Sequence, residues 1–289
     1  MSALRFAEDY QTVLSEVMTG FEGFDLVVND DIQTGNSSYI AKHRHEYLRT
    51  LQDVDTFFGG ARDKDIFEIG AFFGVVSIAL ARLGYRVTAS DVPEYMGLEA
   101  QQTRFSSERV AVHQMNLSDY LLDLPDDSVD CVIMTEVLEH LNFNPLPLFK
   151  EINRVLRPGG LFYVSLPNGA QIRNRVQAAL GRPIGLDIQD FFKQLDAQHE
   201  LIANGHWREY TMQEVHALVT PLGFAPKRAY YFGLGECETS RAPRKVLGRL
   251  FYRAFPAFKE NQTNLFVKTD RTALHFDIPG TVHPTMRQL

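Results

Sequence analysis

Short apolar runs alternate with helical segments through the middle of the chain, and this alternation limits the fold more than any other feature. Runs at 65–70, 86–91, 110–116, 129–136 and 160–168 are each separated by helical patterns or glycine turns. Strands that alternate with helices form a parallel sheet covered on both faces. Two further runs at 225–233 and 263–269 complete the set. We therefore predict an α/β fold with a doubly wound, mostly parallel seven-stranded sheet.

The domain boundaries follow from the same patterns. Residues 1–60 are expected to be mostly helical, as a cap or as part of the core. The sheet domain is expected over 61–270, with a helical insertion at 169–205 and an irregular tail at 271–289. The insertion follows the carboxyl end of the fifth strand, and open α/β sheets bind ligands at that edge.

Composition excludes several classes of protein. The 289 residues are 45% hydrophobic and 22% charged, which is typical of a soluble globular protein. A net charge of −7 argues against wholesale nucleic-acid binding. Two cysteines form no disulfide framework, and the first residues show no signal-peptide core, so we expect a cytoplasmic protein.

A glycine turn with a downstream acid indicates a nucleoside-containing cofactor. The segment "FEIGAFFG" supplies Glu68, Gly70 and Gly74 where the first strand meets its helix, and Asp91 ends the next strand. Glycines allow a tight turn and a close approach, and an acid about 20 residues further on can accept both ribose hydroxyls. The structural alternative is that the glycines serve packing and Asp91 caps a helix.

Phe72 narrows the choice of cofactor. Dinucleotide sites carry a glycine at this position, which makes room for a pyrophosphate. The bulky ring favours a cofactor with adenosine and no phosphates, such as S-adenosylmethionine. Phe72 and the lack of a nearby Tyr-x-x-x-Lys pair argue against an NAD(P)-dependent oxidoreductase or epimerase.

The segment "TEVLEH" places Glu136, Glu139 and His140 where one helical turn would bring them onto a shared face. Three interpretations remain open. The acids can stabilise a helix start; His140 or His206 can act as a general base; or Glu136, Glu139, His140 and His206 can bind Mg²⁺ or Mn²⁺.

At this point the chain resembles the class I S-adenosylmethionine-dependent methyltransferases. The resemblance rests on "FEIGAFFG", "SD" at 90–91, "LPDDSVDCVIMTEVLEHL", "EINRVLRPGGLFYVSLPN" and "REYTMQEVHALVTPLGF". It implies roles for the cofactor residues: contact with the methionine moiety for Glu68, Gly70, Gly74 and Glu136, with the ribose for Asp91, and with the adenine for Val92, Asn116 and Leu117.

The acceptor is indicated only by finer resemblances. The Glu-x-x-Glu-His turn is similar to those of small-RNA 3′-end ribose methyltransferases and quinone-pathway O-methyltransferases, which implies a metal. The insertion and "GHWREYT" resemble methyltransferases of glycan and glycolipid pathways. We expect an enzyme that methylates a hydroxyl of a sugar, glycoconjugate or related polar molecule. An RNA-ribose or phenolic acceptor, and a catalytically silent binding partner, are the alternatives.

Residues 241–258 form a basic amphipathic pattern with Arg241, Arg249 and Arg253 among aromatic residues. This pattern is typical of helices that touch a membrane surface. It is also compatible with a crossover helix whose aromatic side chains pack on the core. The sequence carries no signal for the oligomeric state.

Overall fold

The computed structural model describes residues 3–21, 27–28, 31–32, 36–185, 206–233 and 243–269, together with 272 and 274. Predictions for the later part of the insertion (186–205), for Arg241 and for most of the tail lie outside these residues.

Seven strands form one mixed sheet, as the alternating pattern predicts. The order across the sheet is β5-β4-β3-β6-β7-β9-β8. The pairs among β5, β4, β3, β6 and β7 are parallel, whereas β9 runs antiparallel to both β7 and β8. The strands are β3 (Asp65–Ile69), β4 (Arg86–Asp91), β5 (Ala111–Gln114), β6 (Val129–Thr135), β7 (Leu156–Pro167), β8 (Phe224–Phe232) and β9 (Asn261–Lys268). A separate pair, β1 (Val27–Val28) and β2 (Asp31–Ile32), is antiparallel.

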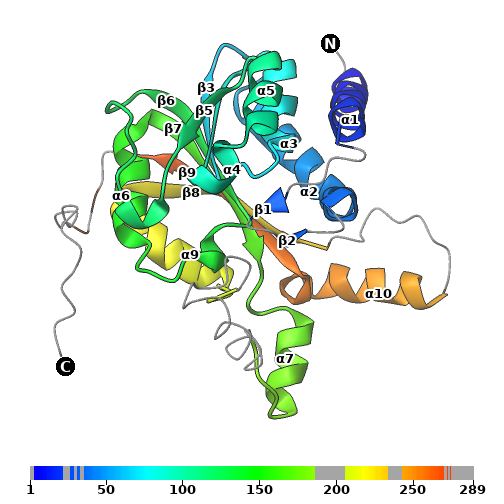
Figure 1. Cartoon of the computed structure of the whole chain (residues 1–289). Helices are drawn as coiled ribbons and strands as arrows, with labels where there is room; N and C mark the ends of the chain where they lie inside the picture. The colour runs from blue at the N-terminus through cyan, green and yellow to red at the C-terminus, as the bar shows by residue number, and fades with distance from the viewer. Residues whose placement is uncertain are drawn as a thin grey trace.

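Helices cover both faces of the large sheet (Figure 1). One layer contains α1 (Ala3–Thr19), α2 (Asn36–Phe57), α3 (Val75–Arg82), α4 (Pro93–Met96) and α5 (Glu99–Ser107); the other contains α6 (Leu146–Val155) and α9 (Met212–Val219). Two more helices, α7 (Ile172–Ala179) and α10 (Pro243–Ala254), project from the body on the side away from α5. None of the helices that the structure describes is long and apolar enough to cross a membrane.

The central strand β6 shows how the two layers are held. Cys131 and Ile133 are fully buried in the cluster that includes α3, and Val132 and Met134 are fully buried in the cluster that includes α6. Successive side chains of a strand point to opposite faces, so a strand buried on both faces reads as a continuous apolar run. The thiol of Cys131 is a core group, as its apolar neighbours in the sequence indicate.

The N-terminal helices complete one helical layer. Tyr10, Leu14 and Val17 of α1 and Leu51 and Val54 of α2 belong to the same buried cluster as α3. The sequence left open whether residues 1–60 form a cap or part of the core. The packing of α1 and α2 corresponds to part of the core.

One expected helix is divided. The sequence predicts a single helix over 92–105, but α4 ends at Met96 and α5 starts at Glu99. Gly97 lies at the break, where a Cβ atom would stand 2.7 Å from the carbonyl oxygen of Pro93. Glycine is also poor at continuing a helix.

Candidate active site

A cavity of about 1210 Å³ opens at the carboxyl ends of β3, β4 and β6, the edge that open α/β sheets use for ligands. Most of the residues singled out from the sequence line its wall. They are Glu68, Gly70, Asp91, Val92, Leu117, Glu136, His140 and His206.

The glycine turn after β3 is closely packed. Gly70 has a φ of 73°, and a Cβ atom there would lie 2.2 Å from Cγ2 of Val137, in the loop after β6. Phe72 also has a positive φ, 47°, and its ring packs against Phe73 and Tyr95 on the cavity wall. A non-glycine residue in this conformation stores strain, roughly 1–3 kcal/mol, and such residues cluster at functional sites.

Asp91 is held in place by the turn that it faces. Its Oδ2 accepts a hydrogen bond from the Phe72 N–H at 2.8 Å, and its Oδ1 accepts one from the Val92 N–H at 2.8 Å. A carboxylate has about four acceptor positions, so capacity for two hydroxyls remains. Burial raises the pKa of Asp91 to about 6, despite these hydrogen bonds. The arrangement fits the ribose of an adenosyl group, with Val92, Tyr95 and Leu117 as apolar wall.

Two expected cofactor residues are not among the residues that line the cavity. Gly74 has a φ of 78°, and a Cβ atom there would stand 2.1 Å from the Phe105 ring, so its small size serves packing between α3 and α5. Asn116 is exposed, and its Oδ1 accepts hydrogen bonds from the N–H and hydroxyl of Ser118. Its amide caps the 3-10 turn Leu117–Asp119 (η1) rather than facing a ligand.

Glu68 is a buried acid at the end of β3. It is 2% exposed and accepts a hydrogen bond from the hydroxyl of Ser77 on α3. Burial raises the pKa of Glu68 to about 8. The side chain therefore holds a proton near neutral pH and ties the first strand to the helix behind the cavity.

The "TEVLEH" turn differs from the predicted helical face. Only Leu138–His140 form a helical turn, a 3-10 turn (η2), and Glu136 precedes it with a left-handed φ of 53°. The expected i, i+3, i+4 arrangement is wrong for Glu136, because the chain reverses there to leave β6. Glu136 instead follows β6 directly, and its N–H donates to the Ser165 carbonyl at the end of β7.

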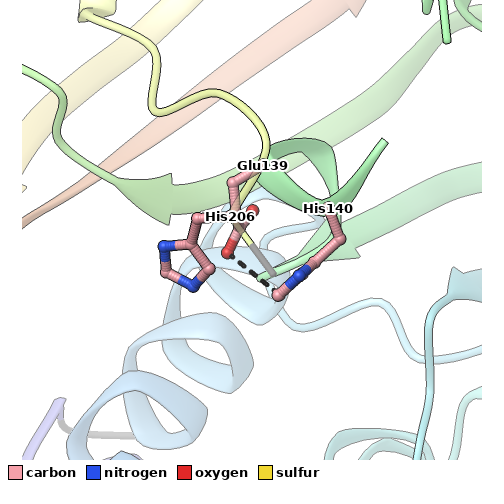
Figure 2. Close-up of side chains that lie close together, drawn as sticks. All are labelled: Glu139, His140 and His206. Carbon is pink, nitrogen blue, oxygen red and sulfur yellow. Dashed lines mark ion pairs between the residues drawn. The ribbon is translucent and has the colours of Figure 1, made fainter. Parts of the chain in front are cut away.

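Glu139, His140 and His206 come together at the inner end of the turn. One potential ligand atom from each lies within 4.8 Å of the others, and Figure 2 shows the Glu139 carboxylate directed toward both rings. The distance from His140 Nε2 to Glu139 Oε1 is 3.8 Å. Among the described residues, neither buried oxygen of Glu139 has a hydrogen-bond donor, and the same holds for the buried Oε1 of Glu136. Glu136 is not part of the close set.

Hydrogen bonds fix the position of His206. The N–H groups of Trp207 and Arg208 donate to the Glu139 carbonyl at 2.7 and 3.3 Å, which joins this distant segment to the turn. The Nδ1 of His206 lies 3.3 Å from Glu209 Oε1. This contact and the nearby Glu139 charge raise the pKa of His206. The segment thus brings a basic imidazole to buried acids.

Helix α2 adds an acid that was not expected at the site. Glu46 is 2% exposed and its Oε1 accepts from the Ser165 hydroxyl at 2.9 Å, while its Oε2 lies 2.9 Å from His43 Nδ1. Burial first, and then the charges of Glu46 and Glu139, raise the pKa of Glu136 well above its usual range. Burial also raises the pKa of Glu139, to about 7. The three carboxyl groups form the acid cluster, defined here as Glu46, Glu136 and Glu139.

The sequence offered a weak signal for the α2 contribution. His43 and Glu46 lie in "HRHEY", where spacing i, i+3 pairs them on one helix face. A solvated helix face gives the same pattern, and nothing local tells the two apart. Burial of these polar side chains against the end of β7 is a tertiary effect.

Comparison with known proteins agrees with this geometry. Residues 67–164 match the family model of a methyltransferase domain. The chain is 37% identical over 105 residues to a probable S-adenosylmethionine-dependent methyltransferase of Mycolicibacterium smegmatis, which covers 36% of this chain and 38% of that protein. It is 34% identical over 110 residues to a ubiquinone biosynthesis O-methyltransferase of Xanthomonas campestris, which covers 38% of this chain and 44% of that protein.

The chain carries a class I S-adenosylmethionine-dependent methyltransferase domain. Solved structures share the fold of this methyltransferase domain. A protein of Pyrococcus horikoshii OT3 superposes with a TM-score of 0.53 at 14% identity, covering 80% of this chain and 92% of that one. An S-adenosylmethionine-dependent methyltransferase of Mesorhizobium loti gives 0.50 at 16% identity, covering 76% and 97%. The match to both curated relatives spans less than half of their length.

Proposed function

We propose that the protein is an S-adenosylmethionine-dependent O-methyltransferase acting on a hydroxyl of a sugar, glycoconjugate or related polar small molecule. The observation that carries the proposal is the shared cavity. Asp91 and the glycine turn form one part of its wall, and Glu136, His140 and His206 form another. A hydroxyl bound beside these imidazoles would lie next to a methyl donor bound along the turn.

S-adenosylmethionine supplies a methyl group on a positively charged sulfur. The acceptor oxygen forms a bond to the methyl carbon while the carbon–sulfur bond breaks, and the products are a methyl ether and S-adenosylhomocysteine. Most of the acceleration would come from holding the two reactants in line. Asp91 would bind the ribose of the cofactor.

The hydroxyl proton needs an acceptor within the protein. His140 and His206 line the cavity, and their rings lie 4.9 Å apart. A neutral imidazole can take a proton from the attacking hydroxyl as a general base. Glu209, which raises the pKa of His206, would stabilise the imidazolium that results.

A divalent cation fits the same groups. Buried carboxylate oxygens are normally paired, and both oxygens of Glu139 lack a donor among the described residues. Carboxylates with one or two imidazoles suit Mg²⁺ or Mn²⁺. Glu139, His140 and His206 would hold the ion, with Glu136 beside them, and a bound ion would acidify and orient the acceptor hydroxyl.

A phenolic or quinone-type acceptor is the second candidate. Relatives matched over residues of the same domain include ubiquinone biosynthesis O-methyltransferases. A catechol presents two adjacent hydroxyls, as a sugar diol does, and the described wall would serve either. The ribose at an RNA 3′ end is the third, disfavoured by the net charge of −7.

A methyl-transfer assay with three acceptor panels tests the proposal. The release of S-adenosylhomocysteine is measured with sugars and glycosides, with catechols, and with RNA carrying a free 3′ ribose, each with Mn²⁺ and with chelator. We expect turnover on a hydroxyl acceptor that falls at least tenfold in His206→Gln, while His113→Gln, at a histidine outside the cavity wall, stays active. Methylation of amine acceptors alone would refute O-methylation.

A further inference from the structure

Two projecting helices carry exposed apolar side chains. On α7 and the residues after it, Val176 is 48%, Leu180 58% and Ile184 49% exposed. On α10, Leu247 is 68% and Leu250 58% exposed. The crossover-helix interpretation of 241–258 expects the aromatic side chains to pack on the core, but Phe251 is 37% and Phe255 52% exposed. The structure instead leaves them in solvent, on a helix that extends from the body (Figure 1).

The two helices form one surface. The guanidinium of Arg175 on α7 lies 4.7 Å from the ring centre of Phe258, which follows α10. The Phe258 ring stacks on Phe251 of α10 at 5.6 Å, and Phe255 lies 5.3 Å from Phe251. Phe255 is itself 52% exposed. These contacts join α7 to the aromatic side chains of α10 and of the residues after it. We call the exposed apolar and basic side chains of these two segments the α7–α10 surface.

The charge of this surface is opposite to that of the chain. The net charge is −7, yet residues 170–185 and helix α10 contain no acidic residue. Their basic residues are Arg173, Arg175, Arg182, Arg244, Lys245, Arg249 and Arg253. Basic residues interleaved with exposed leucine and phenylalanine are the pattern of helices that lie in the interface of an anionic bilayer. A soluble monomer seldom exposes a contiguous apolar patch without a partner.

The α7–α10 surface borders the mouth of the cavity. Ile172 and Arg173 begin α7 and line the cavity, and Glu260 and Asn261, which follow α10, also line it. A bilayer that held the two helices would therefore lie against the cavity opening. An acceptor anchored in the bilayer would reach the cavity by its polar head alone.

We propose that the α7–α10 surface binds an anionic lipid bilayer and that the acceptor is a hydroxyl on the polar head of a lipid-anchored molecule. The second part rests on the proposed methyltransferase function, and the first does not. Apolar side chains enter the interfacial region, and the arginines pair with lipid phosphates. The arrangement selects lipid-linked acceptors because their heads are presented at the opening.

Vesicle flotation with the full chain tests the surface. Vesicles of phosphatidylcholine, with and without phosphatidylglycerol, are mixed with the protein and floated. We expect the protein to float with the anionic vesicles, and binding to weaken at high salt. In the double variant Leu247→Glu, Leu250→Glu we expect binding to fall at least tenfold. Leu121→Glu, at a 48% exposed leucine remote in the sequence from both helices, is the matched control and should float.

The proposal would be overturned if neither the intact protein nor the Leu121→Glu control floated with the anionic vesicles. It would also be overturned if the double variant floated as well as the intact protein. If the intact protein instead stayed in solution as a dimer and the double variant were a monomer, the surface would be assigned to self-association. S-adenosylhomocysteine titration of the double variant separates the two proposals. A double variant that binds the cofactor normally but no longer floats would support the lipid-binding surface. An intact protein that floats but does not bind the cofactor would support the surface and refute the methyltransferase function.

Discussion

A single substitution in the acid cluster, Glu139→Gln, tests whether the buried carboxylates form a binding site for a cation. Glu139 is fully buried, and its pKa of about 7 lies above the ordinary value of 4.5. The folded protein therefore holds a proton that the unfolded chain releases between these two values, so stability falls as the pH rises from 4.5 through 7. The difference of about 2.5 pKa units corresponds to roughly 3 kcal/mol above pH 8.

A glutamine at position 139 does not titrate, so the stability of the variant should not fall in this way as the pH rises. Its amide can donate a hydrogen bond to the neighbouring Glu136, so no charge is buried unpaired. In chelator at pH 8 we expect the variant to be more stable than the parent by up to roughly 3 kcal/mol. At pH 5 the two should be nearly equal, because the parent is then protonated. Chemical denaturation at both pH values measures the difference.

A divalent ion should offset most of this difference in stability. An ion at about 100 times its dissociation constant stabilises the parent by about 2.7 kcal/mol. For a chain of this size each kcal/mol raises Tm by about 2–4 °C, so Mn²⁺ should raise the parent Tm by roughly 5–10 °C. The variant, without the Glu139 charge, should gain little. An equal Mn²⁺ shift in both proteins would refute the ion site. A variant less stable than the parent in chelator at pH 8 would refute the unpaired-carboxylate reasoning.

Further predictions concern the glycine turn and its surroundings. Glu68 has a pKa of about 8, so the stability of the parent should fall as the pH rises from 4.5 to 8, by about 1.4 kcal/mol per pH unit at most. In Glu68→Gln, chemical denaturation over this pH range should show a smaller dependence of stability on pH. An unchanged slope would contradict the raised pKa of Glu68. Gly74→Ala should destabilise the fold by roughly 2–4 kcal/mol, because its Cβ meets Phe105 and its φ is positive. The folded fraction should keep its cofactor affinity, and a selective loss of affinity would place Gly74 at the ligand after all.

The fold follows closely from local sequence patterns. Apolar runs in the sequence indicate β6 and the strands β8 and β9, and Gly84 marks the end of α3. The sequence does not mark the break at Gly97 clearly, because an isolated glycine is tolerated within a helical pattern. The contact of its missing Cβ with the Pro93 carbonyl appears only in three dimensions.

The site was predicted where a strand end defines it. Asp91 and Gly70 sit at fixed places in the strand–turn–helix unit, so spacing alone brought them to the cavity. The resemblance to the methyltransferases implied that Asn116 contacts the adenine, yet its amide caps η1. Glu46 was only weakly indicated, because "HRHEY" fits a solvated helix face equally well and α2 reaches the cavity through packing between segments far apart in the chain. Glu136 shows a third limit: the left-handed turn at a glutamate has no sequence signature.

The central claim is that the cavity binds an adenosyl cofactor through Asp91. Calorimetric titration of S-adenosylhomocysteine into the intact protein, Asp91→Ala and Glu94→Ala tests it most directly. Glu94 is an exposed acid that does not line the cavity and serves as the control. We predict micromolar binding to the intact protein and the control, weakened about 10- to 100-fold in Asp91→Ala by the loss of charged hydrogen bonds to the ribose. No binding to the intact protein, or equal binding by all three, would contradict the account.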